Sequence, residues 1–136
     1  IKVENPNKRS PGLPGDVTRY FEPLMEQPDG QRRRSAYFAM LNGGKESIML
    51  QLDPKAEDAQ ADRTVFEAML GRADVLVENF RPGVLNDLGY GWEALHRKFP
   101  RLIVASLSGF GQTGPYSHRK AVDTIIQGMS GFIAST

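Results

Sequence analysis

The sequence has 136 residues, of which 40% are hydrophobic and 24% charged, a composition typical of one globular domain rather than of a disordered or collagen-like chain. Its 17 lysines and arginines nearly balance 16 aspartates and glutamates, so a net charge of +1 attracts neither nucleic acid nor an anionic membrane strongly. The chain has no cysteine, which excludes disulfides, thiolate metal sites and a cysteine nucleophile. No apolar run approaches the roughly 18 residues of a membrane helix, and no signal-peptide pattern opens the chain, so we expect a cytoplasmic protein without a metal site.

Both ends of the sequence look truncated. Ile1–Val3 resembles the end of a strand whose beginning is missing, and the apolar segment 125–133 stops at Thr136 without a polar cap or turn. We therefore expect residues 1–136 to be part of a larger domain that extends beyond both termini.

The chain begins with a proline-rich stretch and then alternates between strand and helix patterns. Residues 4–34 hold five prolines and show no periodicity, which predicts a long surface loop. In chain order, the pattern then predicts a strand (47–52), a helix (65–73), a strand (74–78) and two short helices (82–91 and 92–99). A strand (102–107), a glycine-rich loop (108–115) and a helix from residue 121 onward follow. This order is typical of a doubly wound, mainly parallel α/β sheet, in which ligands bind at the carboxyl ends of the strands.

Gly109–Gly114 matches the pattern G-x-G-x-x-G that binds dinucleotides when it joins a strand directly to a helix. Here Pro115–Ser117 intervene before any helix, and no following strand supplies a carboxylate for a ribose. A requirement of the turn therefore explains these glycines better than a nicotinamide cofactor does.

Glu78–Gly83 is more informative, because it follows a buried strand and leads into a helix. Asn79 and Arg81, together with backbone N–H groups, are suited to holding phosphates, and Phe80 offers a face to a ring. In the alternative interpretation Asn79 only caps the helix and Arg81 is a surface charge. The residues alone leave both interpretations open.

The other polar candidates have a simpler structural explanation. The basic run Arg32–Arg34 is suited to phosphate but is typical of a solvated loop. His96 and His118 have no partnered nucleophile in the sequence, and no G-x-S-x-G motif is present. Asp123 either stabilises the start of the last helix or contacts a ligand held over residues 108–114.

Several strings together resemble one family, the class III CoA-transferases, which include formyl-CoA transferase, carnitine CoA-transferases and α-methylacyl-CoA racemase. The likeness covers essentially the whole chain, and the string from Glu78 to Gly83 in its strand-to-helix setting is its most specific part. The strings are residues 1–6 with Gly15, Asp16 and Arg19, residues 42–48, residues 73–83, and residues 106–115 with Asp123 and Gln127.

The resemblance implies a Rossmann-like domain that binds coenzyme A (CoA), in an enzyme whose two identical subunits interlock. Gln51 stands where the family usually has aspartate, and Asp87 stands where an arginine commonly contacts phosphate. By position, the residues that match the family's CoA contacts are Asn5, Leu50, Gln51, Leu52, Asn79, Phe80, Arg81, Lys120, Val122 and Asp123.

Family transferases use an aspartate as nucleophile, which attacks a thioester and forms an aspartyl-CoA intermediate. The resemblance implies that this aspartate lies beyond Thr136, so no catalytic residue is expected within the chain. In the racemases a histidine occupies the position of Val122, and valine cannot carry a proton. A CoA-transferase is therefore favoured over a racemase, and a CoA- or nucleotide-binding module without chemistry of its own is a third interpretation.

Overall fold

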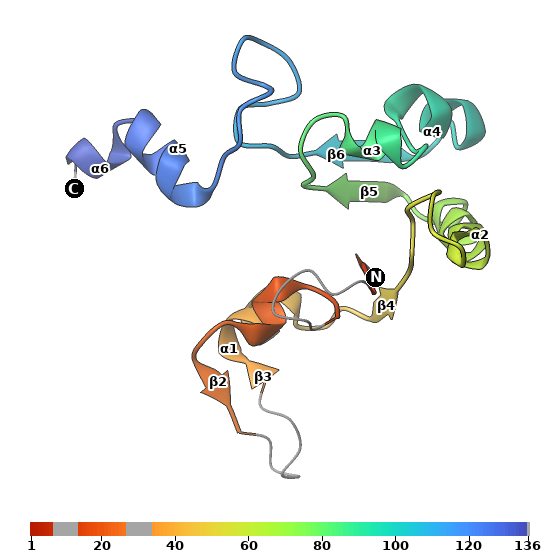
Figure 1. Cartoon of the computed structure of the whole chain (residues 1–136), viewed down its shortest axis with the longest axis horizontal. Coiled ribbons are helices and arrows are strands. Elements are labelled where there is room, and N and C mark those ends of the chain that lie inside the picture. Colours follow the sequence, from red (N-terminus) through yellow and green to blue (C-terminus); the bar gives the residue numbers. More distant parts are fainter. Residues whose placement is uncertain (7–13, 27–33, 136) are drawn as a thin grey trace. The chain divides into compact units, whose positions relative to one another are not determined.

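The computed structural model describes residues 1–6, 14–26 and 34–135. Within them the chain forms two compact units, Ile1–Phe66 and Glu67–Thr136. Figure 1 follows the chain from β1, in red, to α6, in blue. The strands described form three two-stranded sheets, of which two are parallel and one is antiparallel.

The first unit is built on a parallel strand pair. β1 (Lys2–Glu4) lies beside β4 (Ser47–Met49), with Lys2 opposite Ser47 and Glu4 opposite Met49. The chain between these strands forms a 3-10 helix, a short antiparallel pair and a helix: η1 (Val17–Tyr20), β2 (Leu24–Met25) with β3 (Arg34–Ser35), and α1 (Ala36–Asn42).

Part of the stretch predicted as a long loop is therefore ordered by short local motifs. Asp16 caps η1 by accepting a hydrogen bond from the Thr18 backbone N–H at 2.9 Å. Just after this stretch, the Ser35 hydroxyl caps α1 in the same way, accepting from Phe38 N–H at 3.2 Å. Elements of two to seven residues are too short to show a periodicity in the sequence, which is why the pattern predicted none of them. The basic residues Arg32 and Arg33 lie outside the described residues.

A longer helix follows β4 and crosses the boundary between the two units. α2 (Ala59–Leu70) buries Ala59, Phe66 and Leu70, which lie seven and four residues apart on one face. The helix predicted over residues 65–73 is confirmed in this region, and the apolar spacing that predicted it holds for Phe66 and Leu70 but not for Val65, which is exposed.

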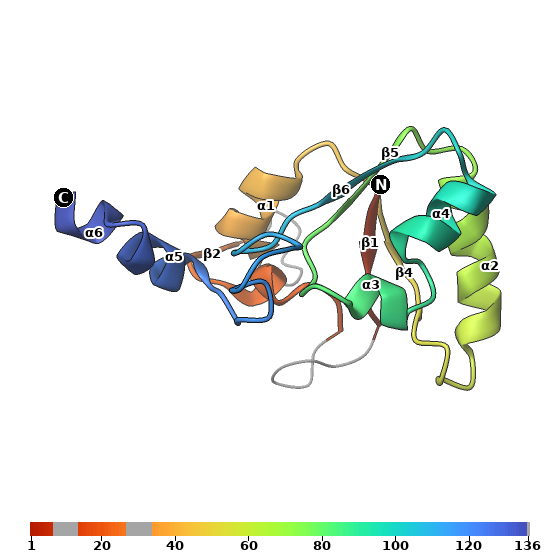
Figure 2. The same ribbon diagram turned by 90° about the horizontal axis from the view of Figure 1, so that it is seen from above.

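The second unit holds the other parallel pair. β5 (Val75–Glu78) lies beside β6 (Ile103–Ser106), with Val75 opposite Ile103 and Glu78 opposite Ser106. The chain returns from β5 to β6 through α3 (Val84–Asp87) and α4 (Trp92–Lys98), as Figure 2 shows. Strand, helical connection and parallel strand confirm the predicted α/β fold.

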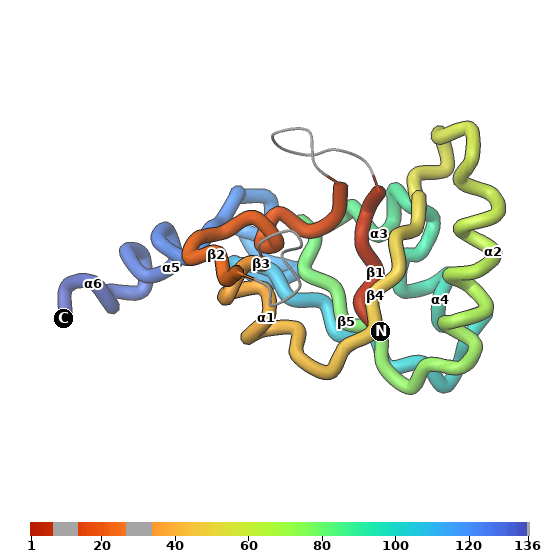
Figure 3. Tube along the Cα trace, turned by 90° about the horizontal axis from the view of Figure 1, so that it is seen from below, coloured from red at the N-terminus to blue at the C-terminus, as the bar shows by residue number. Residues whose placement is uncertain are grey.

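The crossover contributes three buried side chains to the core of the second unit, whereas Trp92 at the start of α4 is exposed. Tyr90, Leu95 and Leu102 are each less than 5% exposed. After β6 the chain passes through a loop to α5 (Asp123–Met129) and α6 (Phe132–Ser135), and Figure 3 traces this path to the blue end of the tube. No helix in the described part of the chain is long and apolar enough to cross a membrane.

Candidate functional site

The corner that follows β5 is held by the last residue of the strand. The Glu78 carboxylate accepts a hydrogen bond from Phe80 N–H at 2.7 Å, and the Arg81 carbonyl accepts one from Val84 N–H at 3.1 Å. α3 begins after Gly83, whose φ of +92° is allowed for glycine but strained for other residues. Asn79 does not cap this helix, so the capping interpretation of Asn79 is wrong. Asn79 and Arg81 are both exposed at the corner.

The glycines of the loop after β6 each have a local structural reason. Gly111 and Gly114 adopt φ angles of +79° and +91°. A Cβ on Gly109 would lie 2.2 Å from the Ala121 Cβ, so only glycine lets the loop pass this close to the start of α5. The turn interpretation of the G-x-G-x-x-G match therefore accounts for all three glycines.

The corner and the loop enclose a small pocket of about 70 Å³. It lies past the ends of β5 and β6, where open α/β sheets bind ligands. No acidic side chain lines it, whereas two arginines do. Its lining residues are Asn79, Phe80, Arg81, Pro82, Ser108, Gly109, Phe110, Ser117, Arg119 and Ala121. We call this the loop pocket.

The loop pocket brings together some of the predicted CoA contacts and leaves others apart. Asn79, Phe80 and Arg81 all line it. The resemblance also implies contacts within residues 120–123, and of these only Ala121 lines the pocket. Val122 instead precedes the first turn of α5, where Asp123 accepts a hydrogen bond from the Gln127 side chain. Lys120 is exposed.

The predicted contacts of the first unit are largely used by the fold itself. Leu50 and Gln51 are 4% and 7% exposed. The Gln51 backbone N–H donates to the Asp62 carboxylate at 2.7 Å, and its side-chain carbonyl accepts from Asp53 N–H at 3.0 Å. The Leu52 carbonyl accepts from Arg63 at 2.6 Å. Leu52 and Asn5 are half-buried, so their side chains are the ones in this group that reach the surface.

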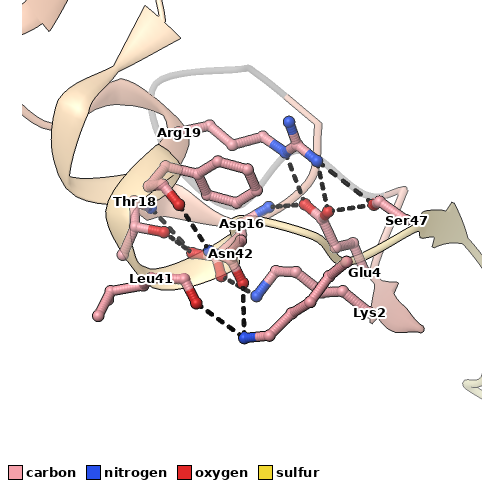
Figure 4. Close-up of polar contacts among 10 residues, drawn as sticks. Lys2, Glu4, Asp16, Thr18, Arg19, Leu41, Asn42 and Ser47 are labelled. Atoms are coloured by element: carbon pink, nitrogen blue, oxygen red, sulfur yellow. Dashed lines mark hydrogen bonds and ion pairs between the residues drawn. The ribbon is translucent and has the colours of Figure 1, made fainter.

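The first unit also contains a buried carboxylate that holds several segments together. Figure 4 shows Glu4 accepting hydrogen bonds from the Arg19 guanidinium at 2.6 and 2.8 Å, from Asp16 N–H at 2.7 Å and from the Ser47 hydroxyl. Nearby, Lys2 pairs with Asp16 at 2.6 Å. The Arg19 guanidinium also lies over the Phe38 ring, 4.0 Å from its centre.

These donors set the ionisation of the buried acid. Burial alone raises the pKa of Glu4, but the hydrogen bonds from Arg19, Ser47 and Asp16 N–H outweigh it and lower the pKa to about 2. The same bond to Glu4 raises the pKa of Arg19. Glu4 and Arg19 are therefore charged at neutral pH.

A larger basic pocket of about 530 Å³ adjoins Arg19 within the first unit. Its charged residues are all basic, namely Lys2, Arg19, Arg34 and Lys45, and its rings come from Tyr20 and Phe38. Lys2 and Arg19 pair with carboxylates, and Lys45 donates to the Leu41 carbonyl at 2.8 Å, whereas Arg34 has no carboxylate partner among the described residues. No role was predicted for Arg19 from the sequence, although Arg19 is among the residues that carry the family resemblance. Its carboxylate partner Glu4 lies 15 positions earlier, too far away for a local pattern to link the two.

The remaining candidates form no site. His96 is exposed and stacks on Trp92, with ring centres 4.9 Å apart, and His118 is exposed in its loop. The described residues contain no group of three side chains suited to holding a metal ion.

Comparison with known proteins identifies the class of protein. The sequence pattern of CoA-transferase family III matches residues 1–136, and the chain belongs to this family. It is similar to acetyl-CoA:oxalate CoA-transferase of Acetobacter aceti, with 46% identity over all of this chain and 31% of that protein. It is also similar to succinate–glutarate CoA-transferase of Agrobacterium fabrum, with 41% identity over all of this chain and 32% of that protein. Formyl-CoA:oxalate CoA-transferase of Escherichia coli is 37% identical over 29% of its length.

Solved structures agree with this membership. A CaiB/BaiF family protein from Brucella suis has a TM-score of 0.79 at 38% identity, over 96% of this chain and 31% of that one. A protein from Mycobacterium tuberculosis has a TM-score of 0.76 at 30% identity, over all of this chain and 34% of that one. These neighbours confirm the predicted Rossmann-like α/β fold. The chain spans about a third of the length of the relatives it matches.

Proposed function

We propose that the complete gene product is a CoA-transferase that moves CoA between carboxylic acids, and that residues 1–136 supply part of its CoA-binding surface. The family membership of the chain supports this proposal, as do three relatives that are named as CoA-transferases of different acids. CoA in its thioester form is the implied substrate, and no metal is required.

The observation that carries the proposal is the loop pocket past β5 and β6. It combines the Asn79 amide, the Phe80 ring and the Arg81 guanidinium with a second arginine, and it contains no acid. A nucleotide with phosphates offers partners for each of these groups, because arginine binds phosphate oxygens and aromatic rings contact bases.

The transfer itself uses an aspartate nucleophile that the family resemblance implies beyond Thr136. Its carboxylate attacks the thioester carbonyl of the donor, giving a mixed anhydride and CoA thiolate. The thiolate then attacks the aspartyl carbonyl, which forms an aspartyl-CoA thioester and releases the donor acid. The acceptor carboxylate attacks this thioester, which forms a second mixed anhydride and releases CoA thiolate. The thiolate then attacks the acyl carbonyl of the acceptor, which gives the new acyl-CoA and restores the aspartate. Residues of this chain contribute by binding CoA and so positioning the thioester.

Mass spectrometry of the complete gene product tests this chemistry. After incubation with acetyl-CoA, succinyl-CoA or formyl-CoA, we expect a covalent CoA or acyl adduct on an aspartate. CoA binding without an adduct from any of these thioesters contradicts the transferase and favours a module that only binds CoA.

We also propose that the complete protein is an interlocked homodimer, as the family resemblance implies. Light scattering of the complete gene product is expected to give twice the mass of one chain. A monomeric mass contradicts this part of the proposal.

A further inference from the structure

The basic pocket of the first unit has the size of a small-molecule site. Its volume is about 530 Å³, within the range of roughly 300 to 1,000 Å³ that is usual for such sites. Four cations line it, and among the described residues no acid does. It shares no lining residue with the loop pocket, so it is a separate cavity.

Two of the four cations are neutralised by the protein itself. Lys2 pairs with Asp16 at 2.6 Å. Arg19 pairs with Glu4, also at 2.6 Å, and Figure 4 shows both pairs. The Lys2 ammonium and the Arg19 guanidinium lie 5.7 and 4.0 Å from the centre of the Phe38 ring. These pairs therefore order one wall of the pocket and add no net charge to it.

The other two cations keep their charge. Arg34 is exposed and has no carboxylate partner among the described residues. Lys45 donates to the Leu41 carbonyl at 2.8 Å and to the Asn42 side-chain oxygen at 3.3 Å, both of which are uncharged. An ammonium group has three N–H donors, so one is left for a ligand. The described part of the pocket thus has two positive charges in excess, which favours a ligand with two negative charges.

These two charges flank the helix α1. Arg34 comes two residues before its first residue, and Lys45 comes three residues after its last. A helix of seven residues is about 10 Å long. A chain with a carboxylate at each end is suited to both cations at once, whereas a single small anion at one end leaves the other cation unpaired. Linking the two carboxylates also makes the second contact intramolecular, which raises the affinity.

The side chains that line the pocket between these charges are apolar. Phe38 and Ala39 belong to α1 and so lie between the two cations along the chain. The Tyr20 ring lines the same pocket, and its hydroxyl donates to the Pro14 carbonyl at 2.8 Å. Aromatic and methyl groups stabilise a methylene chain by removing it from water, but they add nothing to the binding of an inorganic anion.

We propose that the basic pocket binds a linear dicarboxylic acid, with one carboxylate at Arg34, the other at Lys45 and the methylene chain between them against Phe38 and Ala39. A carboxylate accepts charge-assisted hydrogen bonds from a guanidinium and from an ammonium group, so both ends are satisfied. The inference goes beyond the proposed function, because it assigns a ligand to the first unit without involving CoA.

Calorimetric titration of the complete gene product in the absence of CoA tests the proposal. The probes are glutarate, butyrate and inorganic phosphate, of which butyrate matches glutarate except for the second carboxylate. We expect glutarate to bind about tenfold more tightly than butyrate, the lower end of the range for a hydrogen bond to a charged group, because both cations are exposed. Phosphate that binds as tightly as glutarate contradicts a site with two separate ends.

Two variants each remove one end of the site. Arg34→Gln and Lys45→Gln are both expected to weaken glutarate about tenfold, to the affinity of butyrate. Butyrate itself is expected to lose about twofold at most, because a single carboxylate still has the remaining cation as a partner. Arg101→Gln and Lys55→Gln are the matched controls, since both residues are exposed and line neither pocket.

A further pair of variants adds charge instead of removing it. Ala39 is exposed in α1 and lines the pocket, so a longer side chain there reaches the ligand. Ala39→Glu brings a carboxylate that repels the acid, and Ala39→Gln has the same size without the charge. We expect the glutamate variant to weaken glutarate about tenfold more than the glutamine variant does. Equal losses in the two variants contradict recognition by charge.

The outcomes are independent of the transfer chemistry, since no CoA is present in the titrations. Absence of glutarate binding overturns the proposal. Glutarate binding that neither Arg34→Gln nor Lys45→Gln weakens also overturns it, because the acid then binds elsewhere. Equal losses for glutarate and butyrate do the same, since they show a general disturbance of the first unit. If the complete gene product transfers no CoA but these variants act as expected, the proposed function fails and the dicarboxylate site stands.

Discussion

Each unit of the molecule contains an arginine stacked on an aromatic ring, and the two differ in what meets the guanidinium edge. Arg19 lies 4.0 Å from the Phe38 ring centre and donates to the buried Glu4 carboxylate. Arg119 lies 4.1 Å from the Tyr116 ring centre and has no carboxylate partner among the described residues. Two arginines with a similar ring contact therefore have different surroundings. An arginine paired with a buried acid stabilises the fold, whereas a stacked and unpaired arginine beside a pocket is available to a ligand.

Breaking the paired arginine is expected to have the largest effect on stability. Arg19→Gln leaves the Glu4 carboxylate, whose side chain is 1% exposed, without its cation. Removal of one partner from a buried ion pair typically costs about 3 to 5 kcal/mol, and we expect a loss near the lower end because Arg19 is partly exposed. Urea denaturation of the complete gene product measures it. Arg34→Gln is the control, because Arg34 is an exposed arginine that lines the basic pocket together with Arg19. We expect this control to change stability by less than about 0.5 kcal/mol. Equal effects of the two variants contradict the assigned role.

Acid is expected to weaken the same cluster. The pKa of Glu4 is about 2 in the folded protein against an ordinary value of 4.5. Because the folded pKa is the lower one, this contribution to stability is complete above pH 4.5 and is lost as the pH falls toward 2. It amounts to at most about 3 kcal/mol. Denaturation midpoints across this window are expected to fall less steeply for Glu4→Gln than for the unaltered protein. Parallel curves for the two proteins rule out Glu4 as the titrating group.

The loop pocket depends on a close approach of two backbones, which a single methyl group tests. Gly109→Ala places a Cβ about 2.2 Å from that of Ala121, so the loop or the start of α5 has to move. Overpacking of this kind costs about 1 to 3 kcal/mol and is expected to weaken CoA binding as well. Gly43→Ala is the control, because its new Cβ meets nothing closer than 3.5 Å. Ala121→Gly is expected to restore part of the loss in the double variant, and complete additivity of the two changes contradicts the contact.

The smallest expected effect concerns Arg81, the other unpaired arginine of the loop pocket. Arg81→Ala removes one guanidinium from the loop pocket. If that guanidinium contacts a phosphate of CoA, we expect CoA to bind about tenfold more weakly at low salt. Stability is expected to change by less than about 0.5 kcal/mol, since Arg81 is exposed. Calorimetry with Arg101→Ala as control measures the difference. Unchanged affinity returns Arg81 to the role of a surface charge.

The sequence predicted the second unit better than the first, for a physical reason. Strands β5 and β6 are continuous apolar runs, and their carboxyl ends lie together in any parallel pair, so the corner at Asn79–Arg81 was predictable. The cluster around Glu4 joins residues 15 and 43 positions apart through single hydrogen bonds, and no local pattern records such distant partners. The contacts predicted at residues 50–52 came from the resemblance alone. The structure shows Leu50 and Gln51 buried within the fold.

The contact between Gly109 and Ala121 has a mechanical consequence. With no space for even one methyl group between them, the loop at Gly109 cannot approach Ala121, two residues before the start of α5, any more closely without displacing it. The path of the chain into α5 therefore limits the conformations that the loop after β6 can adopt.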